Sequence, residues 1–333
     1  MRQLVYLGPR NMELQEAPEP SPGPGEVVFE TEAAAICGSD LHGFREASPR
    51  RIPPLVMGHE GVGRISAVGE SVDPARVGEH VVLRPMLACG ECEPCREGRP
   101  NLCRNGRLVG REITGAFAER FVVPERAAVG FPRDVPADLG TLTEPLANAV
   151  HVSTRAVREG DDVLVIGAGP IGALMARMAL ERGAGRVFIT DPIASRLELA
   201  RGQGATPLEG EDPEAALLEA TGGRGVDVVI DAAGFEATWA LGLRAVRPGG
   251  RFEAVGLGTP GARIDFFAVA GKEIRVTGSF AWTEEDFDRA IELIASGALD
   301  AGGWLTTMPL AEGQRAFEEL VDTTDRFKVV LVP

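Results

Sequence analysis

Hydrophobic and polar positions give the two halves of the chain different patterns. Residues 1 to about 145 are rich in glycine and proline, and they carry short apolar runs at 26–31, 63–68 and 80–83. Apolar runs of this length, separated by turn residues, indicate β-strands. The first half is therefore predicted to form a β-rich domain with many turns.

The pattern changes from Asp161 onward. An apolar strand, a glycine turn and an amphipathic helix follow one another, and a second strand is predicted at residues 186–190. Strand, helix and strand in this order form a βαβ unit. Further strands are predicted at 227–234 and 250–256, with a helix near 237–245 between them. This alternation predicts a doubly wound parallel sheet.

The tail from about Thr277 is predicted to hold helices near 284–296 and 311–321 and a last strand at 327–333. We expect this tail to return to the first domain. The fold class is therefore α/β, with a β-rich domain and a doubly wound domain. The predicted domain bounds are 1–145 for the β-rich domain, 146–274 for the doubly wound domain and 275–333 for the return to the first domain.

Composition narrows the class of protein. The chain has 333 residues, 44% of them hydrophobic and 25% charged, which is ordinary globular composition. No apolar run reaches the roughly 20 residues that span a bilayer, and the N-terminal segment lacks the features of an export signal. We therefore expect a soluble, cytoplasmic protein. The net charge of −15 and the absence of a basic stretch argue against nucleic acid and acidic membranes as partners.

Four of the five cysteines fall within one short segment, CGECEPCREGRPNLC. Gaps of two residues let neighbouring thiolates turn toward one ion, and a longer loop can bring the fourth sulfur back to complete a tetrahedron. Disulfides between residues this close would be strained. The sequence contains no second cluster motif, which argues against an iron–sulfur cluster. The segment therefore predicts a closed, structural zinc site. Its ligands are Cys89, Cys92, Cys95 and Cys103.

A glycine-rich turn, GAGPIG, connects the first strand of the second half to its helix. Gly167 suits the tight turn, Gly169 allows a pyrophosphate to approach the backbone, and Gly172 allows close packing of helix on strand. A flavin nucleotide would fit the same turn, but nicotinamide suits the second metal site described below. The residues expected to contact the cofactor are Gly167, Gly169, Pro170, Ile171, Gly172, Asp191 and Arg196.

Asp191 ends the second strand of this βαβ unit. Its carboxylate can accept hydrogen bonds from the ribose hydroxyls of the adenosine half and would repel a 2′-phosphate, which favours NAD over NADP. The alternative is that Asp191 only caps the helix that starts near Pro192. Arg196 could stack on adenine or pair with a phosphate, so it leaves the cofactor choice open.

A second metal site is suggested by Cys37 in CGSDLH, by His59 and Glu60 in GHEGVG, and by Glu144 in TEPLANAVH. Cysteine, histidine and carboxylate together suit zinc with one coordination position left for water or substrate. Each residue also has a structural explanation: Cys37 as a small buried hydrophobe, His59 as a core histidine, and Glu144 as an acid at a helix start.

Taken together, these segments resemble the zinc-containing medium-chain dehydrogenase/reductase family, in its sorbitol or polyol dehydrogenase-like and threonine dehydrogenase-like branch. The resemblance covers the whole chain and rests on CGSD, GHE, the four-cysteine segment, EPL, GAGPIG with Asp191, and the closing KVVL strand. It implies a GroES-like catalytic domain and a Rossmann domain. It also implies two zinc ions per chain, with NAD as the cofactor.

The resemblance also implies roles for individual residues. Cys37 and His59 match zinc ligands of every zinc-bearing branch, and Glu60 matches the third ligand of the sorbitol dehydrogenase-like members. Glu144 matches an acid that lies beside the metal and binds it directly or through water; classical alcohol dehydrogenases have a cysteine near this position. Asp40 would orient His59.

Ser39 and His42 complete the residues implied by the resemblance. Ser39 matches the hydroxyl that receives the alcohol proton, and His42 matches the end of the proton relay. For His42, a solvated histidine without a catalytic role is the alternative.

The function implied is a zinc-dependent alcohol dehydrogenase that transfers hydride from a secondary alcohol or polyol to NAD and gives a ketone. L-Threonine 3-dehydrogenase is the first alternative, suggested by the NAVH segment at residues 148–151. A non-catalytic nucleotide-binding protein on the same fold is the second alternative, and the retained metal-ligand candidates argue against it. The expected partners are a small-molecule alcohol and further copies of the chain, as a homodimer or homotetramer.

Overall fold

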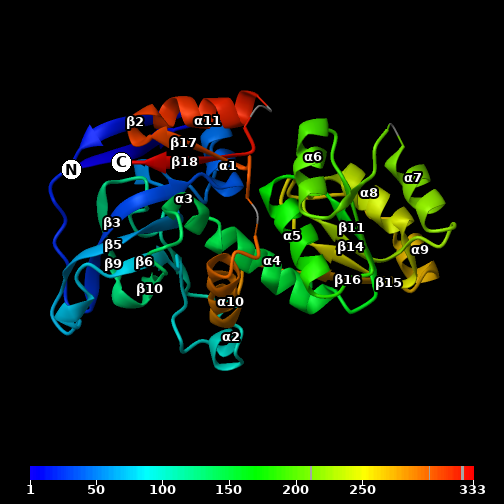
Figure 1. Ribbon diagram of the computed structural model, residues 1–333, viewed down its shortest axis with the longest axis horizontal. Coiled ribbons are helices and arrows are strands. Elements are labelled where there is room, and N and C mark those ends of the chain that lie inside the picture. Colours follow the sequence, from blue (N-terminus) through cyan, green and yellow to red (C-terminus); the bar gives the residue numbers. More distant parts are fainter. Residues whose placement is uncertain (211, 300, 324–325) are drawn as a thin grey trace. The chain divides into compact units, whose positions relative to one another are not determined.

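A computed structural model describes residues 1–210, 212–299, 301–323 and 326–333. The chain forms two compact units, and each brings together its own strands (Figure 1). The first unit comprises Met1–Glu144 and Phe287–Pro333, and the second comprises Pro145–Asp286. The predicted boundary at residue 274 is therefore wrong for the short segment that follows it. That segment stays with the second unit because β16 (Arg275–Gly278) pairs with β15 (Val246–Ala254).

The largest sheet of the first unit runs in the order β10-β6-β5-β3-β18-β17, and β9 also pairs with β3. The strand β18, which comes last in the sequence, is antiparallel to β3, with Val330 opposite Ala35. A strand from the C-terminal tail therefore completes a sheet that begins near the N-terminus. The strands are β3 (Glu26–Ala35), β5 (Glu60–Val68), β6 (His80–Leu83), β9 (Arg120–Pro124), β10 (Ala128–Gly130), β17 (Leu305–Pro309) and β18 (Lys328–Val332).

Smaller elements complete the first unit. One small sheet has the order β2-β1-β4, and another pairs β7 with β8. These strands are β1 (Arg2–Gly8), β2 (Asn11–Glu16), β4 (Leu55–Val56), β7 (Met86–Leu87) and β8 (Arg107–Leu108). The helices of this unit are α1 (Gly38–Arg45), α2 (Glu93–Arg96), α3 (Ala137–Gly140) and α11 (Gly313–Asp322). Two further helices cross the division between the units: α4 (Thr143–Ala156) starts in the first unit, and α10 (Glu284–Ala295) ends in it.

Aromatic packing fixes helix α1 in the first unit. The ring of Phe44 in α1 lies 5.1 Å from that of Phe317 in α11, and Phe317 also meets the edge of Phe117. All three rings are fully buried. Offset aromatic pairs add to the free energy gained from burial. The C-terminal turn of α1 is therefore held by the core beneath it.

The second unit contains a parallel sheet, whose described strands run in the order β13-β12-β11-β14-β15-β16. This is the order of a doubly wound dinucleotide-binding sheet, as the alternation of strands and helices predicts. Figure 1 shows α5 and α6 on one side of the strands and α8 and α9 on the other. The elements are β11 (Asp162–Ile166), α5 (Pro170–Glu181), β12 (Arg186–Thr190), α6 (Ala194–Gly202), β13 (Thr206–Pro207), α7 (Pro213–Ala220), β14 (Val226–Asp231), α8 (Glu236–Ala245) and α9 (Phe266–Gly271).

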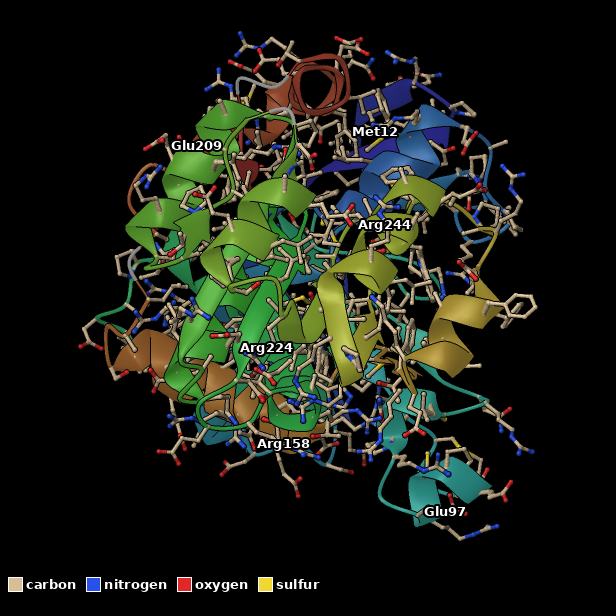
Figure 2. The ribbon with its side chains drawn as sticks, turned by 90° about the vertical axis from the view of Figure 1, so that its right-hand side faces the viewer. Met12, Glu97, Arg158, Glu209, Arg224 and Arg244 are labelled. Atoms are coloured by element: carbon tan, nitrogen blue, oxygen red, sulfur yellow. The ribbon has the colours of Figure 1, made fainter. Side chains whose placement is uncertain are left out.

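A network of charges lies at the amino ends of β11 and β14 and includes Arg224, labelled in Figure 2. Arg186 and Arg224 each place a nitrogen 2.6 Å from Asp162, and Arg224 also pairs with Asp227 at 3.1 Å. The network joins neighbouring strands at the end of the sheet opposite the glycine turn. Within the described residues, no helix is long and apolar enough to cross a membrane.

Candidate functional site

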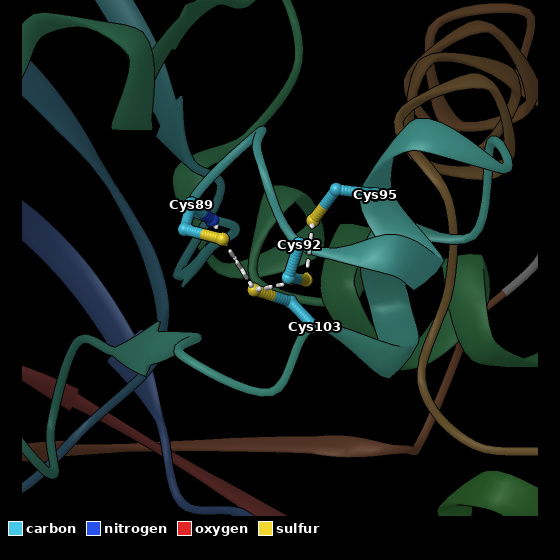
Figure 3. Close-up of side chains that lie close together, drawn as sticks. All are labelled: Cys89, Cys92, Cys95 and Cys103. Carbon is cyan, nitrogen blue, oxygen red and sulfur yellow. Dashed lines mark hydrogen bonds between the residues drawn. The ribbon is translucent and has the colours of Figure 1, made fainter.

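The four-cysteine segment folds into a lobe in which all four sulfurs converge (Figure 3). Cys92 Sγ lies 3.4 Å from Cys95 Sγ and 3.7 Å from Cys103 Sγ, and Cys103 Sγ lies 3.4 Å from Cys89 Sγ. Sulfurs bound tetrahedrally at zinc–sulfur distances of about 2.3 Å would lie about 3.8 Å apart. All four thiols are free. The arrangement therefore fits one zinc ion with no open coordination position.

The backbone of the lobe favours thiolates. Backbone hydrogen bonds from Cys95 and Arg104 lower the pKa of Cys92 to about 6. Desolvation and the neighbouring Cys92 raise the pKa of Cys95 to about 12. One thiolate thus opposes the ionisation of the next, and a divalent cation among them would remove this opposition.

Cys37, His59 and Glu60 form a second group, whose potential ligand atoms all lie within 4.8 Å of one another. The pairing of two strands brings them together: Ala35 at the end of β3 lies opposite Glu60 at the start of β5. Cys37 follows β3 and precedes α1, while His59 directly precedes β5. Segments far apart in the sequence therefore meet where β3 ends and β5 begins.

Glu60 is a buried acid with an unusual environment. Its side chain is 1% exposed, and neither carboxylate oxygen accepts a hydrogen bond of ordinary geometry from the described residues. Desolvation raises the pKa of Glu60 well above its ordinary range, although the nearby Lys328 opposes the shift. Lys328 Nζ lies 2.6 Å from Glu60 Oε2 and donates to the backbone oxygen of Ile36. A carboxylate with this surplus accepting capacity suits a cation.

Asp40 connects the first turn of α1 to His59. It is fully buried, and its Oδ2 accepts a hydrogen bond of 3.3 Å from the backbone N–H of Cys37. Its Oδ1 lies 3.6 Å from His59 Nδ1, which has no hydrogen-bond partner among the described residues. With Nδ1 facing a carboxylate, His59 has Nε2 left for a metal.

The donor set fits zinc. One thiol, one imidazole and one carboxylate are the three kinds of protein ligand that zinc accepts, and three of them leave one position open. Desolvation raises the pKa of the Cys37 thiol, and the charges of Asp40 and Glu144 add to the rise. A dication would reverse this shift, because it stabilises the thiolate.

Three further predicted residues lie in α1 and at the start of α4. Ser39 and His42 are exposed on α1, three positions apart, so they lie on one side of the helix. Desolvation and the nearby Arg45 lower the pKa of His42. Glu144, near the start of α4, is not among the residues within 4.8 Å, but its charge acts on Cys37, Glu60 and Lys328. A place for Glu144 beside the metal therefore stays a prediction.

The glycine turn of the second unit has the geometry of a nucleotide-binding turn. Gly167 has φ 98°, which favours glycine, and a Cβ on Gly172 would lie only 1.8 Å from the backbone oxygen of Gly167. A Cβ on Gly169 would meet nothing within 4 Å, so the space above the start of α5 is open. Pro170 begins the helix, and the N-terminal N–H groups of α5 can receive a phosphate.

Asp191 follows β12 and is fixed by backbone donors. Its Oδ2 accepts from Ala168 N at 2.8 Å and its Oδ1 from Ile193 N at 2.9 Å. Each carboxylate oxygen retains a lone pair for a ribose hydroxyl. Arg196 Nη1 lies 3.8 Å from Asp191 Oδ2, so the two residues expected to influence the cofactor choice are neighbours.

Two residues that the sequence analysis did not single out contact Glu60 or the neighbouring Asp40. Lys328 begins β18 and pairs with Glu60, as described above. A lysine at the start of an otherwise apolar strand, in a chain with only two lysines, is a signal that could have identified it. Arg51 Nη2 donates to Asp40 Oδ1 at 3.1 Å and to Ser39 Oγ at 3.2 Å. Nothing in the sequence distinguishes Arg51 from its neighbour Arg50.

Both halves of the chain match models of known protein families. The model of the alcohol dehydrogenase GroES-like domain matches residues 23–133, and that of the zinc-binding dehydrogenases matches residues 170–296. Together these matches cover more than half of the chain. They confirm the predicted fold class, with a GroES-like domain and a Rossmann-like domain.

Individual relatives agree with these matches. The L-threonine 3-dehydrogenase of Thermococcus kodakarensis is 36% identical over 86% of this chain and 85% of its own length. The D-xylulose reductase A of Aspergillus oryzae is 34% identical over 89% of this chain and 86% of its own length. An Escherichia coli alcohol dehydrogenase solved with NADH has a TM-score of 0.93 and 30% identity, and the match covers 100% of this chain and 99% of that one.

The chain belongs to the zinc-containing medium-chain dehydrogenase family. It is an oxidoreductase of the alcohol and polyol dehydrogenase type, and threonine dehydrogenase is the alternative within the family.

Proposed function

We propose that the chain oxidises a secondary alcohol or polyol to a ketone, with NAD as hydride acceptor. The observation that carries this proposal is the gathering of Cys37, His59 and Glu60 within 4.8 Å beside the first turn of α1. Zinc bound there would polarise the alcohol oxygen as a Lewis acid, and NAD bound at the glycine turn would accept the hydride.

The protein's own residues would bind, orient and remove a proton. Ser39 would accept the alcohol proton, and His42 would pass it on to solvent. Asp40 would keep His59 oriented toward the metal. Glu144 would bind the metal in exchange with water, or lie beside it, during turnover. The four-cysteine lobe takes no part in the reaction, because four sulfurs leave no open position.

L-Threonine 3-dehydrogenase is the second candidate function. It is supported by the identity to the enzyme of that name and by the Asn148–His151 segment in α4. Both functions use a secondary alcohol, so they differ in the groups beside the reacting carbon.

Substrate oxidation separates the two functions. Zinc-loaded protein would be screened for NADH formation with polyols, vicinal diols, simple secondary alcohols and L-threonine at matched concentrations. The proposal predicts the highest kcat/KM with a polyol or diol. A preference for L-threonine would establish the second candidate. If the zinc-loaded protein binds NADH but oxidises none of these substrates, the proposal is contradicted.

Asp191 supports the choice of NAD. A 2′-phosphate would meet like charge and would lose the ribose hydroxyl hydrogen bond, so we expect kcat/KM for NAD to exceed that for NADP by at least about tenfold, or ~1.4 kcal/mol. Steady-state kinetics with both cofactors test this. Equal values would instead assign Arg196 as a phosphate partner.

We propose that the chain forms a homodimer, alone or within a tetramer, through the edge of its parallel sheet. All four residues of the edge strand β16 are exposed, and Val276 lies on it. Phe266, Phe267 and Phe280 are 74%, 93% and 55% exposed in the same unit. An open edge with apolar neighbours suits pairing with a second copy. Light scattering should give at least twice the chain mass, and Phe267→Asp should reduce it. A monomeric parent would contradict the assignment.

We also propose that the protein acts in the cytoplasm. Five free cysteines, in two groups that suit zinc, need reducing surroundings to remain thiolates. Cell fractionation would test the location, and recovery in an oxidising compartment would contradict it.

A further inference from the structure

Arg51 is a buried arginine in the first unit. Its side chain is 4% exposed, and its backbone N–H donates to the oxygen of Ser48. The side-chain stem lies against Gly43, where a Cβ would come within 2.6 Å of Arg51 Cγ. The buried Tyr6 fixes Gly43 by donating to its backbone oxygen at 2.7 Å. The position of the side-chain stem is therefore set by its packing against Gly43.

The guanidinium connects two groups of the proposed site. Arg51 Nη2 donates to Asp40 Oδ1 at 3.1 Å and to Ser39 Oγ at 3.2 Å, and Nη1 donates to the backbone oxygen of Arg50 at 3.3 Å. Asp40 in turn contacts the backbone N–H of Cys37 and faces His59 Nδ1. One rigid fork of donors thus reaches both the proposed proton acceptor and the carboxylate that orients a proposed zinc ligand.

We expect the ion pair of Arg51 and Asp40 to add little to the free energy of unfolding. Burying both charges has a large desolvation penalty, so a buried ion pair often stabilises a fold no better than apolar residues would. Its geometry is more specific, because a planar guanidinium fixes the directions in which it donates. One of these directions leads to Ser39 Oγ.

The chemistry of the two groups sets the direction of proton flow. Arginine can only donate, and it stays charged at any pH that the protein meets. Its contact with Ser39 therefore occupies one lone pair of Oγ. The hydroxyl keeps a second lone pair, which can accept one proton, and its own O–H must point away from Arg51.

We propose that Arg51 is a positioning residue for alcohol oxidation, which holds Ser39 so that its free lone pair faces the substrate hydroxyl. In the proton step, the alcohol O–H bond breaks and a new Oγ–H bond forms on Ser39. The proton that Ser39 carried leaves toward His42 and solvent. This inference rests on the proposed function, because it requires Ser39 to accept the proton.

A double-mutant cycle tests the inference on zinc-loaded protein. Arg51→Met keeps most of the stem and removes the donors, and Ser39→Ala removes the acceptor. With the best substrate of the screen, Arg51→Met should lower kcat about tenfold or more, with KM changed less than about twofold. Ser39→Ala should lower kcat about 100-fold. In the Ser39→Ala background, Arg51→Met should lower kcat less than about twofold, because its target is absent.

Controls distinguish positioning from folding. Arg50→Met changes an exposed neighbour, and it should leave kcat, zinc content and the unfolding temperature unchanged. Arg51→Lys keeps the charge but replaces the fork by a single ammonium. It should fold and retain both zinc ions, and its kcat should lie between those of the parent and Arg51→Met. The Lys variant also permits the cycle if Arg51→Met fails to fold.

Two results would overturn the inference and can be told apart. If Arg51→Met, or Arg51→Lys in its place, lowers kcat equally in both backgrounds, Arg51 does not act through Ser39, and the proposed function stands. If Ser39→Ala itself keeps the kcat of the parent, Ser39 is not the proton acceptor. The proposed role of Ser39 then fails, and the role of Arg51 fails with it.

Discussion

At the scale of single residues, the candidate metal group is distinguished by the buried ion pair of Glu60 and Lys328. Both side chains are at most 3% exposed, and their charged atoms lie 2.6 Å apart. Removing one partner of a buried pair leaves an uncompensated charge, at a cost of about 3–5 kcal/mol. A zinc ion beside Glu60 would take over part of this compensation.

This predicts a larger effect of Lys328→Met on the zinc-free protein than on the zinc-loaded protein. Thermal unfolding with and without chelator would measure it, and Lys328→Arg, which keeps the charge, serves as the control. The gain in unfolding temperature on adding zinc should be greater in Lys328→Met than in the parent, because ligand binding stabilises the folded state. An equal gain in both proteins would show that Lys328 does not share Glu60 with the metal.

Sequence reasoning at this scale depends on chemistry that is local in the chain. Cys37, His59 and Glu60 stand in short segments whose residue types suggest a ligand set, and the structure gathers them. Lys328 was missed because its burial depends on packing between distant segments, and Arg51 because nothing in the sequence distinguishes it from Arg50. Lys328 reaches Glu60 only because β18 is inserted beside β3, which no local pattern specifies.

At the scale of elements, the four-cysteine lobe contains only short helical segments. Its helix α2 spans only Glu93–Arg96, too short to be stable alone. We expect Cys103→Ser to lose one zinc ion and to make this lobe susceptible to proteolysis, because metal binding supplies its folding free energy. Limited proteolysis with mass analysis would locate the cut. A lobe that stays resistant without its zinc would contradict this assignment.

The charge network at the amino ends of β11 and β14 predicts a dependence of stability on pH. Hydrogen bonds from Arg186, and then from Arg224, lower the pKa of Asp162. Burial alone would raise the pKa of Asp227, but donors from Arg224, Asp162 N–H and Arg247 outweigh it and lower it. Carboxyl groups with a depressed folded-state pKa stabilise the fold above their unfolded pKa of about 3.9, and this contribution is lost as the pH falls below it.

Asp227→Asn tests this dependence. At neutral pH it should destabilise the protein by about 1–2 kcal/mol, a value reduced by the exposure of the arginines. The difference in unfolding temperature from the parent should shrink as the pH falls from about 6 to about 3. A difference that stays constant over this range would show that the network does not titrate on unfolding.

At the scale of the whole molecule, the order of elements was predictable and one boundary was not. The alternation of strands and helices after Asp161 predicted the parallel sheet, because buried parallel strands are continuous apolar runs. The segment after residue 274 was assigned to the first domain, yet β16 adds to the second unit's sheet. Its four exposed residues carry no burial pattern that could mark it as part of that sheet.

The most direct test of the central claim, that Cys37, His59 and Glu60 bind a catalytic zinc separate from the four-cysteine zinc, is the zinc content of purified protein. Elemental analysis should give two ions per chain in the parent and one in Cys37→Ser and in Glu60→Ala, with NADH binding retained and alcohol oxidation lost in both variants. Glu144→Ala should bind the second ion more weakly without unfolding. Two ions and near-parent turnover in Cys37→Ser and Glu60→Ala would contradict the account.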